Sequence, residues 1–467
     1  MSASAATAIL LLAICLPGDP DPMGLDDARH LLGRAGFAPT PAELQVFASL
    51  PREEGVRRLL DGTRVTPVTP MPEWVHTAPG DLLPPKGATR KERMELRRRG
   101  RQMGEELKAW WAGEMVATDS PFTEQMVLFW HNHFTSGLRK VRSPIFMARQ
   151  NALFRRHASG SLRVLLHEIA RDPAMLLYLD TQRNNKARPN ENFARELLEL
   201  FTLGEGHYGE ADVKEAARAF TGWKVDARRG AFRKVRRQHD GGAKTFLGQR
   251  GDLDGEEILD ILLEHPRLAL TITEKLWREF ISDAPVEEEV ERLAVIFRAS
   301  DLQMEPLLEA LFSSPFFWEA AGRGSLIRSP VELVVGTART FGAEPERPAL
   351  LARAIRSMGQ DLLDPPNVKG WPGGERWITA TTLLARRGFL AAALRGQGMG
   401  GKGAGGKGKG ARALTSWWRS LGESRSERLE RARRVLLPTS PVHSLPPGNG
   451  PQAALRHLLL DPAYQLK

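Results

Sequence analysis

The chain has 467 residues, of which 42% are hydrophobic and 26% are charged. This composition is ordinary for a soluble protein with a sizeable core. The length allows either two or three structural domains or one large helical domain. The formal net charge of +10 favours anionic partners. Because acidic residues are interspersed almost everywhere, the alternative is that the basic residues are simply spread over the surface.

The single cysteine, Cys15, lies in an apolar run at 5–16. This run has the length of a signal-peptide core and is too short to span a bilayer. Residues 1–22 are therefore predicted to be a signal peptide, with the mature chain periplasmic or extracellular. No Lys or Arg precedes the run, and translation from Met23 would instead give a cytoplasmic chain. Loss of Cys15 would exclude disulfides, thiolate metal sites and a cysteine nucleophile. No other segment is apolar enough to span a membrane.

Helical periodicity recurs along the whole chain, beginning at 26–37. A second helix starts at Thr40, which can act as its cap, while Pro41 suits the first helical position and Glu43 completes a capping box. A proline-rich loop at 67–85 precedes a long helix at 91–115. Further helices are predicted at 122–130, 142–155, 162–171, 190–203, 212–221, 255–264, 269–281, 286–298, 304–312 and 330–341.

Period-two alternation is hard to find in this sequence. The predicted fold is therefore all-α or nearly all-α, a large multi-helix globular fold with one short irregular or hairpin excursion around 230–250. Residues 23–395 would form the main helical domain, either undivided or as two lobes split near 250. Residues 396–410 are predicted to be a flexible Gly/Lys insertion, because such a run cannot bury enough apolar surface to order itself. Residues 411–467 would form a C-terminal helical segment packed on the main domain.

Two histidines, His131 and His133, stand two residues apart at the end of an apolar helix. Residues i and i+2 do not share a helix face, so both could reach one metal ion only if the helix ends or distorts there. The string His-Asn-His is not the nuclease motif of that name, which needs a ββα context that is absent here. The structural alternative is a buried, hydrogen-bonded pair.

The helix at 190–203 concentrates polar residues. Glu191, Arg195 and Glu199 fall at i, i+4 and i+8 on one face, with Glu196 beside them. A salt-bridge ladder is the structural alternative, and each of its pairs would contribute only about 0.2–0.5 kcal/mol. Helix N-termini also favour anions and bound ligands. Arg195 would then hold an anionic group or orient a neighbouring glutamate by bidentate pairing.

His239 and Asp240 lie beside glycines in the least helical part of the chain. His239 could be a general base or a metal ligand, and Asp240 a second ligand. The alternative is a turn in which Asp240 caps the backbone. Trp371 and Trp377, framed by glycines, suit either a platform for a ring or structural packing.

The first half of the helix at 91–115 is strongly basic. Four arginines make a candidate anion-binding face, with a solvated face of i,i+4 ion pairs as the alternative. They are Arg97, Arg98, Arg99 and Arg101.

A set of specific strings extends over nearly the whole chain. They occupy 30–37, 129–134, 174–180, 190–204, 213–223, 239–240, 244–248 and 365–372. Together they resemble the bacterial family catalogued as domain of unknown function 1800, from about Asp26 to Lys467. The resemblance implies an exported helical protein, often encoded beside an exported partner that is itself similar to sulfatases and alkaline phosphatases. It implies no reaction.

Two functions are consistent with these patterns. In the first, the chain is an uncharacterised exported enzyme, a metal-assisted or acid–base hydrolase, whose separate polar clusters converge in one open cleft. Its catalytic residues would be His131, His133, Glu191, Arg195, Glu196, His239 and Asp240. A divalent metal would be zinc, manganese or iron, held by His131, His133, His239 and Asp240.

In the second, the chain is a non-catalytic helical scaffold. It would bind the exported sulfatase/phosphatase-like partner or an anionic polymer through the basic helix at 97–101 and the basic tail at 402–409. Nucleic acid is not expected. The polar clusters would then be buried networks that hydrogen-bond to one another.

Overall fold

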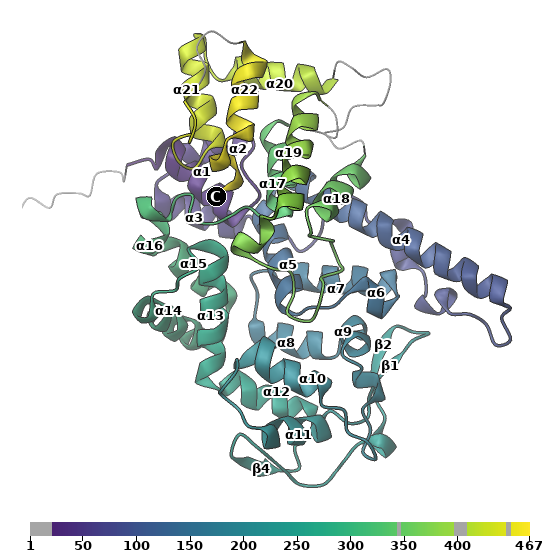
Figure 1. Ribbon diagram of the computed structural model, residues 1–467. Helices are drawn as coiled ribbons and strands as arrows, with labels where there is room; N and C mark the ends of the chain where they lie inside the picture. Colours follow the sequence, from purple (N-terminus) through teal and green to yellow (C-terminus); the bar gives the residue numbers. More distant parts are fainter. Residues whose placement is uncertain (1–20, 343–346, 397–408, 445–449) are drawn as a thin grey trace, which may run out of the picture.

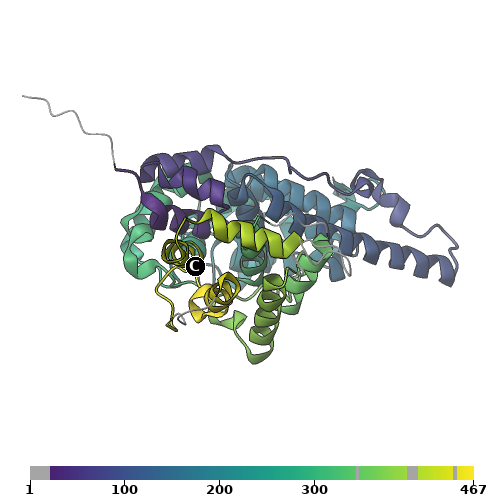
Figure 2. The same ribbon diagram turned by 90° about the horizontal axis from the view of Figure 1, so that it is seen from above.

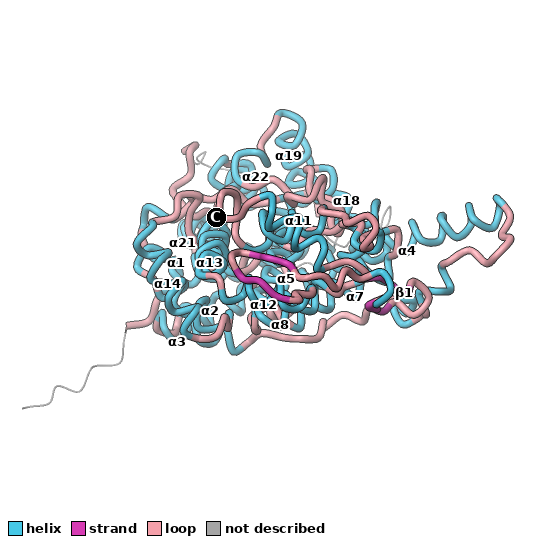
Figure 3. Tube along the Cα trace, turned by 90° about the horizontal axis from the view of Figure 1, so that it is seen from below, coloured by secondary structure: helices cyan, strands magenta, loops and turns pink. Residues whose placement is uncertain are grey.

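The computed structural model describes residues 21–342, 347–396, 409–444 and 450–467. Helices contain 63% of the residues and strands 5%, which confirms the predicted, mostly helical fold (Figure 3). Most of the predicted signal peptide (1–20) and most of the predicted Gly/Lys insertion (397–408), including nearly all of the basic tail, lie outside the described residues.

The N-terminal part of the chain consists of three short helices, two 3-10 turns and one long helix. They are α1 (Gly24–Ala35), α2 (Pro41–Ala48), α3 (Arg52–Asp61), η1 (Glu73–His76), η2 (Pro79–Leu82) and α4 (Arg90–Ala117). The predicted capping box at the start of α2 is present. The Thr40 side chain accepts the Glu43 N–H at 3.2 Å, and the Glu43 carboxylate accepts the Thr40 N–H at 2.7 Å.

The middle of the chain adds a layer of packed helices around α5. The elements are α5 (Pro121–His133), α6 (Leu138–Val141), α7 (Pro144–Arg156), α8 (Leu162–Ala170), α9 (Pro173–Tyr178), η3 (Thr181–Arg183), α10 (Asn192–Glu196), η4 (Leu197–Thr202) and α11 (Glu210–Ala219). Helix α10 continues directly into η4, which is wound as a π-helix.

The predicted excursion around 230–250 is a pair of small antiparallel hairpins that begins earlier than expected. The first joins β1 (Trp223–Asp226) to β2 (Ala231–Lys234), and the second joins β3 (Lys244–Phe246) to β4 (Gln249–Gly251), with η5 (Arg236–Gln238) between them. The earlier start follows from Gly222, whose φ of +81° turns the chain directly out of α11. The β3–β4 turn places Leu247 and Gly248 at positive φ, as a two-residue type I′ turn requires.

The C-terminal half returns to helices. They are α12 (Gly255–Glu264), α13 (Pro266–Phe280), α14 (Glu287–Ala299), α15 (Met304–Ser313), α16 (Pro315–Trp318), η6 (Ala320–Gly322), α17 (Pro330–Thr340), α18 (Pro348–Ser357), η7 (Gly374–Trp377), α19 (Ala380–Leu394), α20 (Lys409–Ser420), α21 (Arg425–Leu436), α22 (Pro451–Leu460) and η8 (Pro462–Gln465).

The C-terminal part of the chain packs against α1 and the segment before α17. Arg434 of α21 pairs with Asp26 of α1 at 3.1 Å, and Leu466 forms an isolated β-bridge with Ile327. Figure 1 shows the C-terminal helices together at one end of the molecule, the hairpins toward the other end, and α4 projecting to one side. The same projection is clear from above (Figure 2). Among the described residues, no helix combines the length and apolar character needed to cross a membrane.

Helix α5 lies at the centre of this arrangement. Every residue of α5 is buried except Asn132, which is partly exposed. Leaving a polar side chain buried without a partner costs free energy, so most polar side chains of a buried helix are hydrogen-bonded. Glu124 accepts two hydrogen bonds from Arg155 of α7, at 2.7 and 2.8 Å, and one from Trp111 Nε1 of α4 at 2.9 Å. This ion pair therefore joins three helices inside the core.

We expect Glu124→Ala to lower the free energy of unfolding by about 3–5 kcal/mol, because Arg155 would remain buried without its carboxylate. The matched control is Glu168→Ala, which removes the carboxylate of a half-exposed pair with Arg156. The control should cost no more than about 1 kcal/mol. Urea unfolding followed by circular dichroism measures both changes, and losses of similar size would contradict the central role of the Glu124 pair.

Candidate functional site

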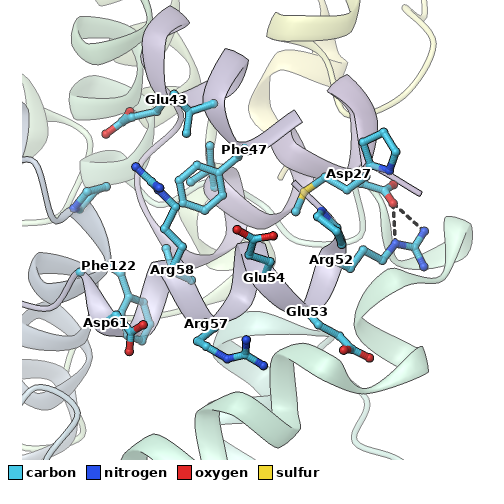
Figure 4. Close-up of a pocket in the computed structure, with 18 of the residues that line it drawn as sticks. Asp27, Glu43, Phe47, Arg52, Glu53, Glu54, Arg57, Arg58, Asp61 and Phe122 are labelled. Atoms are coloured by element: carbon cyan, nitrogen blue, oxygen red, sulfur yellow. Dashed lines mark hydrogen bonds and ion pairs between the residues drawn. The ribbon is translucent and has the colours of Figure 1, made fainter. Parts of the chain in front are cut away.

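A wide cavity of about 1460 Å³ lies between α1, α2, α3 and the start of α5. Figure 4 shows acidic and basic side chains intermingled around it, with Phe47 and Phe122 among them. Asp27 pairs with Arg52 at 2.6 Å on its wall. None of the described residues that line it was predicted as a site residue. The mixture of charges gives it no preference for one kind of ionic ligand.

A second cavity, of about 600 Å³, lies between α5, α13 and the loop that follows α18, and we call it the α5–α13 cavity. It brings together two strings that the sequence singled out, His-Asn-His and Gly-Trp-Pro-Gly-Gly. It also includes residues of α13 and α17 that the sequence did not single out. The residues on which its chemistry depends are Asn132, His133, Lys275, Glu279, Glu332 and Trp371.

The end of η4 places an amine and an imidazole in direct contact. The last carbonyl groups of a helix have no hydrogen-bond donor within the helix, and here neighbouring side chains act as the donors. Lys275 Nζ donates to Leu200 O at 2.6 Å and to His133 Nδ1 at 3.0 Å. His133 Nε2 in turn donates to Phe201 O at 3.2 Å, which assigns the imidazole proton to Nε2. Two of the three N–H bonds of the Lys275 ammonium are thereby used, and the third is left for the cavity.

Burial changes the ionisation of both groups. It lowers the pKa of His133 well below its usual range, and the charge of Lys275 adds to the effect. Loss of solvent around the amine lowers the pKa of Lys275 to about 8, with a contribution from the charge of Arg278. His133 is therefore a neutral hydrogen-bond acceptor for Lys275, and Lys275 titrates close to neutral pH.

A carboxylate network lines the same cavity. Gln125 Nε2 donates to Glu279 Oε1 at 2.8 Å, and the amine of Lys467 lies 3.8 Å from Glu279 and forms an ion pair with Glu332. Burial raises the pKa of Glu279; attraction to Lys467 opposes this rise, and the negative charge of Glu332 adds to it. Glu332 also accepts the backbone N–H of Ser329 at 2.6 Å, so its carboxylate is held in place by several donors.

Asn132 connects the two strings that meet at the cavity. Its Oδ1 atom accepts the backbone N–H of Trp371 at 2.7 Å. The preceding residue, Gly370, has a φ of +87°, and a Cβ atom there would lie 2.2 Å from Asn132 Oδ1. Only glycine allows this approach. The middle residue of the His-Asn-His string therefore holds the loop that forms one wall of the cavity.

His131 has a different environment from His133. Its ring is fully buried among Trp111, Phe154 and Trp371, with centroid distances of 5.5, 5.3 and 6.1 Å. Neither ring nitrogen has a hydrogen-bond partner among the described residues. Burial lowers the pKa of His131 to about 4. The imidazole is thus a neutral, enclosed ring outside the α5–α13 cavity.

The polar face of α10 is a surface salt-bridge network. Arg195 pairs with Glu191 at 3.0 Å and with Glu210 at 2.7 Å. Burial raises the pKa of Glu196, and the negative charge of Glu199 adds to the effect. Neither Glu191, Arg195 nor Glu196 lines the α5–α13 cavity. The ion-pair alternative therefore accounts for Glu191 and Arg195.

His239 and Asp240 form a structural turn. His239 Nδ1 donates to Thr221 O at 3.0 Å. Asp240 pairs with Arg218 at 2.8 Å and accepts the backbone N–H of Gly242 at 2.9 Å. The hydrogen bond from Arg218 is the main cause that lowers the pKa of Asp240, to about 2. These contacts match the turn alternative.

These positions correct the expectation of one shared site. His131 and His133, two residues apart on a regular helix, project toward different neighbours, and His239 and Asp240 are engaged in their own turn. Within the described ranges, no three His, Cys, Asp or Glu side chains are close enough together to hold a metal ion. No such group surrounds His131, His133, His239 and Asp240 in the described part of the chain. Of the predicted catalytic residues, only His133 lines the cavity.

The residues that accompany His133 were missed because each had an ordinary interpretation in the sequence. Lys275 and Glu279 are spaced i,i+4, as in many surface ion pairs. Ser329 and Glu332 have capping-box spacing, and the structure contains that capping box. Only the burial of these side chains against α5 distinguishes them from surface residues.

The four predicted anion-binding arginines divide into two groups. Arg97 and Arg101 line a third cavity beside α4, whereas Arg98 and Arg99 do not. Arg98 pairs with Glu95 at 2.6 Å on the exposed surface.

The fold defines a large, mostly helical protein with a cavity between α5 and α13. The profile of the family described as Protein of unknown function (DUF1800) matches residues 30–466. The chain belongs to this family, as the strings in its sequence indicated. No curated protein and no solved structure matches the chain, so the comparisons assign it no reaction.

We expect His131→Leu to stabilise the protein more at pH 5 than at pH 7.5. The folded-state pKa of about 4 lies below the unfolded value of 6.5, so between these values the unfolded chain binds a proton that the native chain does not. Native stability therefore falls by up to about 3 kcal/mol as the pH drops through this window. Leucine removes that contribution, which chemical denaturation at several pH values measures. If the free energy of unfolding of the variant changed with pH in parallel with that of the wild type, the lowered pKa of His131 would be contradicted.

Proposed function

We propose that the chain is an acid–base hydrolase that acts in the α5–α13 cavity. One observation carries the proposal: Lys275 and Glu279 lie one turn apart on the same face of α13, line the same cavity, and have pKa values shifted toward each other. Acid–base catalysis is most efficient when both groups titrate near the working pH. Enzymes use burial to lower the pKa of a lysine and to raise the pKa of a glutamate.

The proposed roles follow the protonation states that dominate between the two pKa values. The Glu279 carboxylate accepts a proton from a water molecule, whose oxygen attacks the electrophilic carbon of the substrate. The Lys275 ammonium donates its third N–H to the oxygen or nitrogen that leaves. After release of the products, Glu279 loses its proton to solvent and Lys275 regains one, so the net reaction is hydrolysis.

His133 would act as a positioning residue in this scheme. Its Nδ1 lone pair and the Leu200 carbonyl hold two N–H bonds of Lys275, so the remaining one has a fixed direction. Trp371, held by Asn132, would form the apolar wall against which the substrate packs. We also propose that this activity lies outside the cytoplasm. The family resemblance and the apolar run at 5–16, which has the length of a signal-peptide core, support this location.

We expect Lys275→Arg and Glu279→Gln each to reduce turnover by about 10²–10⁴-fold, the usual contribution of a positioned acid or base. Arginine keeps the charge but cannot donate a proton readily, since its pKa exceeds 12. The probes are a set of 4-nitrophenyl esters and 4-methylumbelliferyl glycosides. Wild-type activity should fall above about pH 8, as Lys275 loses its proton.

The matched control is Thr271→Val. Thr271 lies one turn before Lys275 on α13, and its Oγ1 donates a hydrogen bond to Leu203 O, at the end of the same π-helix, at 3.2 Å. Thr271 does not line the cavity. The control should lose some stability and keep its activity. The proposal fails if Lys275→Arg retains full turnover, if Thr271→Val loses as much as Lys275→Arg does, or if the wild type hydrolyses none of the probes.

A further inference from the structure

The projecting half of α4 forms one wall of a groove of about 800 Å³, which we call the α4 groove. The other walls come from the end of η2, from α6 and its neighbours, and from the segment around α18 (Figure 1). The described lining residues of this groove and of the α5–α13 cavity do not overlap. It is therefore a separate site, which the proposed hydrolase activity does not use.

The groove is strongly cationic. Its described lining contains seven basic side chains and three acidic ones, an excess of four positive charges. The basic ones are Arg93, Arg97, Arg101, Lys108, Arg139, Arg142 and Arg356.

All three carboxylates of the groove are already engaged by three of these cations. Asp361 pairs with Lys108 at 2.7 Å and with Arg356 at 2.9 Å. Arg356 also pairs with Glu105 at 2.7 Å, and Asp364 pairs with Arg139 at 2.6 Å. The lining therefore has no carboxylate left to neutralise the remaining cations.

The other four arginines form no ion pair with a carboxylate among the described residues. Arg93 donates only to the backbone oxygen of Ala88, at 2.6 and 3.0 Å. Within the described part of the chain, the side chains of Arg97, Arg101 and Arg142 form no hydrogen bond and no ion pair. Four unneutralised guanidinium groups around one groove repel one another unless an anion lies between them.

The arginines of α4 are regularly spaced. Arg93, Arg97 and Arg101 follow one another at i, i+4 and i+8, so they lie on one face about 6 Å apart along the helix axis. Guanidinium groups bind carboxylate and phosphate oxygens in a bidentate way. This row matches a linear ligand that carries several negative charges along its length.

The rest of the lining does not suit a single-stranded nucleic acid. Among its described residues there is no aromatic side chain, whereas single-stranded nucleic acids bind largely by stacking of bases on aromatic rings. Leu96, Leu138 and Pro144 supply apolar surface between the charges. Gly100 leaves the middle of the α4 wall open, since a Cβ atom there would meet nothing within 4 Å.

We propose that the α4 groove binds a linear anionic polysaccharide, a chain of uronate units whose carboxylates pair with Arg97, Arg101 and Arg142. The test is calorimetric titration of the whole protein with a hexamer of galacturonate at several salt concentrations. Binding should weaken steeply with salt. The uncharged galactose hexamer should not bind.

Two variants separate the groove from general surface charge. Arg97→Gln/Arg101→Gln should weaken binding of the galacturonate hexamer by at least about tenfold, since hydrogen bonds to charged groups are lost. Arg98→Gln/Arg99→Gln, the matched control, removes the same charge from residues that do not line the groove and should change binding by less than about threefold.

Gly100→Leu keeps every charge and fills the groove. Because glycine inside a helix costs about 1 kcal/mol relative to alanine, this variant should fold at least as well as the wild type. It should also weaken binding at least about tenfold. Equal losses in the two double variants, unchanged binding by Gly100→Leu, tighter binding of a hexadeoxynucleotide, or no binding to the wild type would each overturn the proposal.

Discussion

The complete burial of α5 is the constraint on which the other helices depend. A buried helix is stabilised when its polar side chains find partners in the surrounding elements, and three polar side chains of α5 do so. Glu124 binds Arg155 of α7, Gln125 binds Glu279 of α13, and Asn132 binds the backbone of the loop at Trp371. These contacts fix the positions of the elements that enclose the α5–α13 cavity.

The π-helical end of α10 shows how a structural need creates a reactive environment. Its terminal carbonyls require donors, and Lys275 and His133 supply them. A lysine drawn into the interior for this purpose loses solvent, and its pKa falls toward neutrality. The position in which Lys275 donates a hydrogen bond to the helix end is therefore also the position in which its pKa is lowered.

The predicted site was only partly recovered because linear patterns identify residue types but not their neighbours. His133 lines the cavity, whereas His131, two residues away, is enclosed by aromatic rings. Glu191 and Arg195 were conspicuous as a cluster because they pair within one segment, whereas Asp240 pairs with Arg218 of α11. Lys275 and Glu279 were inconspicuous because their partners are far away in the sequence.

The helical fold, the capping box of α2, the polar strings and the family were readable from the sequence, because periodicity, caps and motifs are local properties. Which histidine reaches a cavity, which arginines lack a carboxylate and which carboxyl group is desolvated were decided by the tertiary structure. Burial and charge pairing depend on residues brought together from distant parts of the chain. No local pattern contains that information.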